Sequence, residues 1–244
     1  MSDQVSSQDT SSGLPIKTLR EVYDLVDWAE SLRTHLDELG VDYLLDNQPD
    51  PALKRDDEDD DDNKVVDQSA SVAASARKHR KKKRRQDVRI VTELIRASVQ
   101  PAAAVLQDNG YALDAPMQPR GRFDAVIYAM QQHAWRSGLV RDLVLRLCVV
   151  DADSCDTLAA YQGELVELRR RMHCAGCYPG DAHFMWAAVL GLRLAYPALF
   201  AELDERLRAR ELDLPRLMQR IARKAIKETV VVSPSKGTPV RERP

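Results

Sequence analysis

The chain has 244 residues, enough for one large domain or two small ones, and 44% of them are hydrophobic, so a buried core is expected. Only 5% are aromatic, whereas Ala, Leu and Arg are abundant, which favours helices over sheets. Four cysteines are too few for a disulfide-stapled domain of this length, and no apolar run reaches the length of a membrane span. Residues 1–13 are polar and lack the apolar core of a signal peptide, so we expect a disordered tail on a soluble, intracellular protein without a membrane partner.

The first helix is expected between Thr18 and Gly40. Apolar residues recur there at spacings of three and four, which is typical of one buried helical face, and Gly40 is suited to end the helix. The residues of this face are Leu25, Trp28, Leu32, Leu36 and Leu39.

The segment 47–86 differs in composition from the rest of the chain, because it contains a block of acids and a block of bases. The charges of these two blocks cancel, so the net charge of −2 does not reveal them. Seven consecutive acids, Asp56 to Asp62, are followed by a stretch of small residues and then by the basic run Arg77–Arg85. Like-charge blocks of this length repel themselves and bury little apolar surface. We therefore expect a disordered insert, in which the two blocks loosely neutralise each other.

Helical spacing returns at Asp87 and continues through most of the remaining chain. The expected helices cover 87–106 with a break near Pro101, 123–135, 139–150, 157–172, 181–190, 197–210 and 214–228. Proline and capping residues mark several of the boundaries. The sequence thus predicts an all-α protein of about eight short helices, with an N-terminal lobe at 14–150, a C-terminal lobe at 151–229 and a basic disordered tail at 230–244.

Cys174 and Cys177 have the spacing of half a zinc site, with His173 before them and His183 after them. A zinc knuckle needs its histidine one residue before His183 and a further cysteine, which does not follow Cys177 in this chain. A complete ligand set would have to include His173 or Cys155. A redox dithiol is the other chemical interpretation, but such pairs open a helix, whereas this pair follows one.

A turn between two helices is the interpretation we favour for this stretch. Cys174 is then a small apolar residue at a helix end, Gly176 the glycine that ends that helix, and Asp181 the cap of the next helix. Serine in place of both Cys174 and Cys177 should then be nearly neutral, whereas Gly176→Val should be destabilising.

The sequence contains none of the common signatures of nucleotide-binding loops, serine hydrolases, zinc proteases or aspartic proteases. Its carboxylates lie mainly beside arginines on predicted helical faces, as Glu164 and Glu167 do beside Arg169, Arg170 and Arg171. That arrangement is typical of a solvated surface. We expect a non-enzymatic protein without a cofactor or metal.

The basic run is the strongest local signal of function. Eight of its nine residues are cations: Arg77, Lys78, Arg80, Lys81, Lys82, Lys83, Arg84 and Arg85. Such a run binds phosphates by releasing counterions, or binds an import receptor, or is a solvated linker balanced by the nearby acids. Because no aromatic residue lies within it, base-specific reading of a nucleic acid is not expected.

The apolar motifs also occur in a characteristic order. The first motif is a Tyr…Trp element that leads into a helix ending in Leu-x-x-x-Gly (Tyr23, Trp28, Leu36, Gly40). The second is a helix with an internal Tyr and Leu, followed by a Gly…Asp turn (Tyr161, Leu168, Gly176, Asp181). The third is a Gly-Leu pair that precedes a Tyr and a Phe (Gly191, Leu192, Tyr196, Phe200). In this order the chain resembles the Gag polypeptide of copia-type LTR retrotransposons over roughly residues 14–229. It departs from the family in the Tyr23–Trp28 spacing, in Arg193 where a proline is usual, in the charged insert, and in the lack of a zinc knuckle after the last helix.

The resemblance implies a two-lobed, capsid-like protein that self-associates and packages RNA without sequence specificity. It would belong to a copia-type element or be a domesticated remnant of one, and would act in a cytoplasmic virus-like particle. The alternative hypothesis is a nuclear helical adaptor or regulatory protein whose basic run binds an import receptor.

Overall fold

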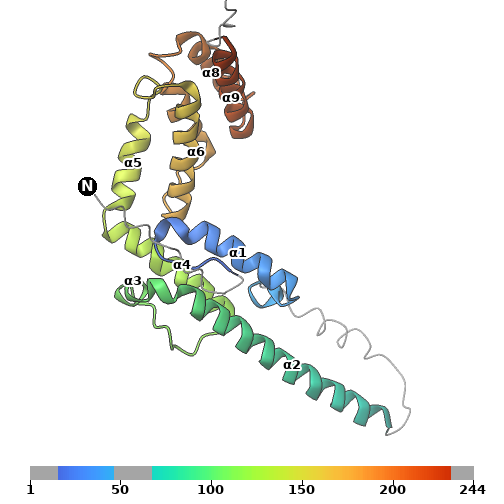
Figure 1. The fold of residues 1–244 in the computed structure, drawn as a ribbon. Coiled ribbons are helices and arrows are strands. Elements are labelled where there is room, and N and C mark those ends of the chain that lie inside the picture. The colour runs from blue at the N-terminus through green and yellow to red at the C-terminus, as the bar shows by residue number, and fades with distance from the viewer. Residues whose placement is uncertain (1–15, 47–67, 232–244) are drawn as a thin grey trace, which may run out of the picture. The chain divides into compact units, whose positions relative to one another are not determined.

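The computed structural model describes residues 16–46 and 68–231, and the regular elements in this part of the chain are all helices, which confirms the predicted all-α fold (Figure 1). The chain divides into two compact units after Arg136. The predicted boundary lay one helix later, at residue 150; the helix Leu139–Val149 belongs to the second unit because it packs on two helices of that unit. The predicted tail at 1–13, the acidic block and residues 232–244 lie outside the described residues.

The first unit contains four α-helices and three single-turn 3₁₀-helices among its described residues. In chain order these are η1 (Val22–Asp24), α1 (Leu25–Glu38), η2 (Asp42–Leu44), α2 (Gln68–Val99), η3 (Gln100–Ala102), α3 (Ala103–Asp108) and α4 (Pro119–Arg136). The predicted break near Pro101 is η3, where the proline occupies the first turn. Of the expected α1 face, Leu25, Trp28, Leu32 and Leu36 are buried, but Leu39 caps the helix and is 49% exposed.

A buried tryptophan ties α1 to α2 and α4. The Trp28 ring is fully buried and lies 5.4 Å from the ring of Phe123 on α4, in a stacked arrangement. Its indole N–H donates to the hydroxyl of Ser98 on α2 at 2.9 Å, and that hydroxyl donates to the carbonyl of Ile95 at 2.8 Å. The backbone carbonyl of Ser98 accepts from Leu19 at 2.9 Å. Since a buried N–H without a partner costs about 1–3 kcal/mol, Ser98 is what allows a tryptophan at this position.

Residues 68–86, predicted to be part of a disordered insert, instead form the first half of α2. The segment has no proline or glycine and is rich in Ala, Lys, Arg and Gln, which are good helix formers. Its second half is anchored on α4, so the helix extends towards its N-terminus without a new nucleation step. Repulsion between like charges four residues apart costs only about 0.2–0.5 kcal/mol per pair, which is too little to unwind it.

The second unit consists of α5 (Leu139–Val149), α6 (Leu158–Cys174), α7 (Asp181–Leu190), α8 (Pro197–Arg208) and α9 (Leu214–Val231) within the residues that the structure describes. Helix α6 packs on α5 and α9, and α7 packs on α5, α8 and α9. The apolar residues of α6 that follow helical spacing, Leu158, Tyr161, Leu165 and Leu168, are buried. On α5, the apolar positions Val140, Leu143 and Leu147 are buried, whereas Val144, which follows the same helical spacing, is 42% exposed.

Tyr161 and Gly191, two residues of the ordered apolar motifs, meet at the end of α7. The fully buried Tyr161 on α6 donates its hydroxyl to the carbonyl of Ala188 at 2.7 Å. Burial raises the pKa of this phenol, so it remains a donor. Gly191 lies against the Tyr161 hydroxyl, and its carbonyl accepts from the N–H of Ala152 at 2.8 Å, so the connection between α5 and α6 passes directly over it.

This close approach predicts that alanine at position 191 is poorly tolerated. An added Cβ would lie 2.5 Å from the carbonyl oxygen of Val150, which is backbone and cannot rotate away. We expect Gly191→Ala to lower the free energy of unfolding by about 1–3 kcal/mol, measured by chemical denaturation. Gly163→Ala is the matched control, because Gly163 lies inside α6 with nothing within 4 Å of its added Cβ. The control should raise stability by roughly 0.5–1 kcal/mol, and equal effects of the two substitutions would contradict the packing described here.

Candidate nucleic-acid interface

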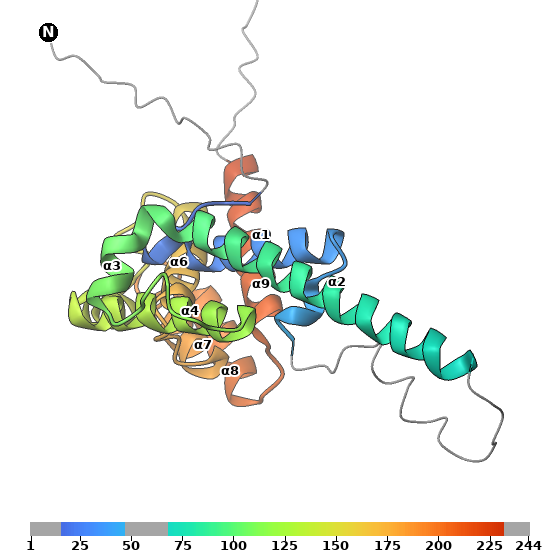
Figure 2. The same cartoon turned by 90° about the horizontal axis from the view of Figure 1, so that it is seen from below.

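The basic run Arg77–Arg85 lies on the first half of α2. In both views of the molecule this half of α2 extends away from the other helices of its unit (Figures 1 and 2). Seven of the eight cations are exposed, and the exception is Arg80, which is half-buried. The structure therefore brings the eight predicted residues together as one continuous helical surface rather than as a flexible linker.

The helical conformation sets how this charge is displayed. At 3.6 residues per turn and 1.5 Å per residue, the run covers about two and a half turns and a length of about 12 Å. Its cations point to several sides of the helix rather than to one face. Arg80 has an interaction partner, and none of the other seven is paired with a carboxylate of the described residues. The result is a short rod of positive charge, seven of whose eight cations are not paired with any carboxylate of the described residues; such a rod meets the electrostatic requirement for binding a phosphate backbone.

The second half of α2 anchors the rod. Val91, Ile95 and Val99 are buried on the side of α2 that packs on α4. At the junction between the two halves, Asp87 is only 9% exposed and its carboxylate accepts from the Tyr43 hydroxyl at 3.0 Å. This hydrogen bond joins α2 to η2 immediately after the last cation. No Phe, Tyr or Trp occurs anywhere in α2, so apart from the imidazole of His79 the interface has no aromatic ring on which a base would stack.

The turn at Cys174–Asp181 is organised by the end of α6. Gly176 has a φ of +67°, its N–H donates to the carbonyl of His173 at 3.1 Å, and the N–H of Cys177 donates to the carbonyl of Met172 at 2.9 Å. This pair of bonds is a Schellman motif, which requires a left-handed residue that glycine adopts without strain. The predicted role of Gly176 is confirmed. Gly40, at a φ of +65°, ends α1 in the same way.

The two cysteines of this turn differ in burial. Cys174 is fully buried, Cys177 is half-buried, and burial raises the pKa of the Cys177 thiol, which opposes the thiolate needed for metal or redox chemistry. His183 is exposed on α7. Within residues 16–46 and 68–231, no three His, Cys, Asp or Glu side chains are grouped so that they could share a metal ion. Because Cys174 is buried, serine there would place a hydroxyl in the core, and the expectation that replacing both cysteines is neutral no longer holds for that residue.

Asp181 does not cap α7, contrary to the sequence prediction. It is the first residue of the helix, after Gly180, and its carboxylate makes no bond to the backbone there. It accepts instead from the Tyr178 hydroxyl and pairs with Arg169 at 3.8 Å. The ring of His173 stacks on Tyr178 at 4.1 Å, and burial together with Arg169 lowers the pKa of this histidine. These contacts hold the connection between α6 and α7 against the last turns of α6.

The carboxylates beside the α6 arginines form ion pairs. Glu167 accepts from Arg170 at 3.0 Å and from Arg171 at 2.7 Å, and these bonds lower its pKa to about 2. Glu164 accepts from Arg146 of α5 at 2.8 Å. Glu167, which these two bonds hold ionised, has no proton to donate near neutral pH. Both carboxylates therefore form ion pairs on the surface of the unit.

Most residues of the ordered apolar motifs are buried or half-buried. Trp28, Leu36, Tyr161, Leu168 and Leu192 are buried, and Tyr23, Tyr196 and Phe200 are half-buried. The Tyr196 hydroxyl donates to Glu228 of α9 at 3.3 Å.

Sequence reasoning missed Arg122, which is only 4% exposed on α4. Its guanidinium donates to the carbonyls of Leu113 at 2.5 Å and Ala115 at 2.6 Å and to the Tyr111 hydroxyl at 3.1 Å. These bonds fix the loop before α4. Nothing in the sequence distinguishes this arginine from the many exposed ones, because arginine is usually a surface residue.

No helix in the described part of the chain is long and apolar enough to span a membrane. Comparisons with protein-family models, with curated proteins and with solved structures found no match to this chain.

The geometry of the α6 end gives a ranking of two neighbouring substitutions. Gly176→Val should lower the free energy of unfolding by about 1 kcal/mol or more, because a β-branched residue is strained at positive φ. Cys177→Ser, one residue later and half-buried, should change it by less than about 0.5 kcal/mol. Chemical denaturation of both variants, with zinc analysis of the purified protein, checks this. The reverse ranking, together with stoichiometric zinc, would restore the metal-site interpretation.

Proposed function

We propose that this protein is a non-enzymatic, Gag-type structural protein that binds RNA without sequence specificity and self-associates around it. The observation that carries the proposal is the exposed basic half of α2, anchored at Asp87. Seven of its eight cations, all but Arg80, are exposed and are not paired with any carboxylate of the described residues. A rod of this kind neutralises the phosphates of any nucleic-acid strand that binds to it. Because it lacks Phe, Tyr and Trp, it does not distinguish one base from another by stacking. The resemblance to copia-type Gag proteins adds the expectation of a role in a retrotransposon particle, or in a domesticated remnant.

The structural role of the motif residues is in keeping with a non-catalytic protein. Tyr161, Gly191 and Gly176 serve packing and helix termination, and Glu164 and Glu167 are held in ion pairs. The proposal therefore assigns the chain to binding and assembly, in the cytoplasm for a particle-forming protein.

An apolar surface on α5 supports self-association. Leu145 and Val149 are 56% and 61% exposed and lie four residues apart on one side of the helix, with Val144 and the exposed Cys148 beside them. Adjacent exposed apolar side chains of this kind are typical of an interaction site. We name these four residues the α5 patch.

Removing charge from the basic run should weaken RNA binding and reduce its salt dependence. In the variant K81Q/K82Q/K83Q/R84Q, glutamine preserves the helix propensity while four positive charges are removed. We expect the affinity for a single-stranded RNA to fall at least tenfold at low salt, and the slope of log K against log[salt] to decrease by about 0.7 for each phosphate that is no longer neutralised. Fluorescence anisotropy across a salt series measures both quantities.

The matched control keeps the charge and changes the side chains. K81R/K82R/K83R should bind RNA as the parent chain does, because phosphate neutralisation depends on charge. Unchanged RNA binding by the glutamine variant would contradict the proposal. If in addition residues 70–90 carried a fluorescent reporter into the nucleus, the alternative of a nuclear adaptor that binds an import receptor would be favoured.

Self-association should depend on the α5 patch. The variant L145S/V149S replaces exposed side chains, so we expect its melting temperature to stay close to that of the parent chain while assembly decreases. Analytical ultracentrifugation of both proteins, with and without RNA, is the measurement. Val166→Ser on α6, which also replaces an exposed apolar residue, is the control and should assemble normally. A parent chain that stays monomeric with saturating RNA would overturn this part of the proposal.

A further inference from the structure

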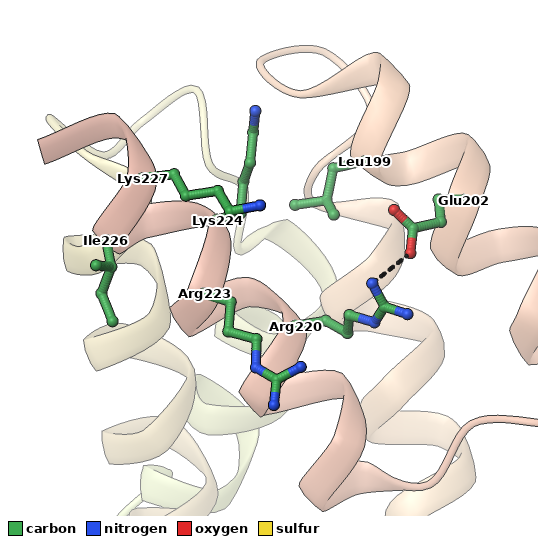
Figure 3. A pocket seen from close by; sticks show the side chains of 7 residues that line it. All are labelled: Leu199, Glu202, Arg220, Arg223, Lys224, Ile226 and Lys227. Carbon is green, nitrogen blue, oxygen red and sulfur yellow. Dashed lines mark ion pairs between the residues drawn. The ribbon is translucent and has the colours of Figure 1, made fainter. Parts of the chain in front are cut away.

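A groove lies between α8 and α9 in the second unit (Figure 3). It forms because these helices pack mainly on other helices of the second unit, α8 on α7 and α9 on α6 and α7. Its volume is about 430 Å³, and its lining residues are Leu199, Glu202, Arg220, Arg223, Lys224, Ile226 and Lys227. Leu199 is buried, whereas Ile226 is 63% exposed.

Four of the lining residues are cations on one side of α9. Arg220, Arg223, Lys224 and Lys227 are spaced by three, four and seven residues, so they follow the same helical face over about 10 Å. Arg223 and Lys227 have no ion-pair partner in the described part of the chain. The concentration of positive charge in a concave surface strengthens its attraction for an anion.

The neighbouring carboxylates compensate only part of this charge. Glu202 is the acid that lines the groove; it pairs with Arg220 at 3.2 Å, as the dashed line in Figure 3 shows, and with Arg206 at 3.8 Å. Beside the groove, Glu228 accepts from the Tyr196 hydroxyl at 3.3 Å and lies 4.0 Å from the Lys224 ammonium. Arg223 and Lys227 therefore remain available to a ligand.

The lining selects among anions. It contains no aromatic residue, so a nucleic-acid strand would find cations but no stacking surface for its bases. Cations distributed along about 10 Å of helix match several linked phosphate groups better than one isolated phosphate. We propose that the α8–α9 groove binds a compact polyphosphorylated anion, with Arg223 and Lys227 as its principal contacts and Glu202 as the group that limits its affinity. This site is separate from the basic run and goes beyond the RNA binding proposed above.

Isothermal titration of the full chain with inorganic tripolyphosphate at low salt tests the site. We expect R223Q/K227Q to weaken binding at least tenfold, since it removes two charge-assisted hydrogen bonds to the anion. R223K/K227R, which keeps both charges, should retain binding. R216Q is the control on the same helix, because Arg216 pairs with Asp213 and lies outside the groove, and it should bind as the parent chain does. E202Q should bind more tightly than the parent chain, because it removes the lining acid and frees Arg220.

Two further arms separate this site from other sources of affinity. The variant K81Q/K82Q/K83Q/R84Q should bind tripolyphosphate like the parent chain, and an unstructured uridine octamer should be insensitive to R223Q/K227Q. Failure of tripolyphosphate to bind, equal binding by R223Q/K227Q, or loss of binding only in the α2 variant would overturn the proposal. An octamer that depends on Arg223 and Lys227 while tripolyphosphate does not would overturn it in favour of a second RNA contact. None of these results alters the test of RNA binding by α2.

Discussion

The hydrogen bond from Trp28 to Ser98 is the constraint on which the first unit depends. Trp28 is the largest fully buried side chain among the described residues, and its indole stacks on Phe123. That indole is tolerated in the interior only because the Ser98 hydroxyl accepts its N–H. Ser98 lies one residue before the end of α2, so the same bond fixes that end of the helix against α1. The exposed basic half of α2 is thereby presented from a fixed base.

In the second unit a glycine has the equivalent importance. Gly191 has ordinary helical dihedral angles, so glycine is needed there because it has no side chain and not because of its conformational freedom. The absence of a Cβ lets the backbone at Val150 and the Tyr161 hydroxyl approach the end of α7, which joins α5, α6 and α7. Gly176 contributes in a different way, since its left-handed conformation ends α6. Gly191 thus allows a close backbone contact, whereas Gly176 ends a helix.

Helical periodicity predicted most of the fold, because a buried face leaves a direct record in the spacing of apolar residues. It placed four of the five residues of the α1 face and the break at Pro101 correctly. Helical periodicity did not predict the helix at residues 68–86, because a helix that extends into solvent has no buried face. Only the helix propensity of these residues and the absence of Pro and Gly indicated the helix. The basic run was predicted from the sequence as a block of charge. Its position on an anchored helix depends on the hydrogen bond between Tyr43 and Asp87, which are 44 residues apart, so local sequence did not predict it. The α8–α9 groove and the partners of Arg122 are likewise products of tertiary packing.

The central claim is that RNA phosphates bind to the exposed half of α2 while its anchored half remains unchanged. NMR titration of the isotope-labelled chain with a short single-stranded RNA tests this directly, because each backbone amide reports on its own surroundings. The account predicts that chemical-shift changes concentrate at residues 77–85 and fall off beyond Asp87, with Ser98 and Trp28 unaffected. Binding with shifts elsewhere and none in the basic run would contradict it.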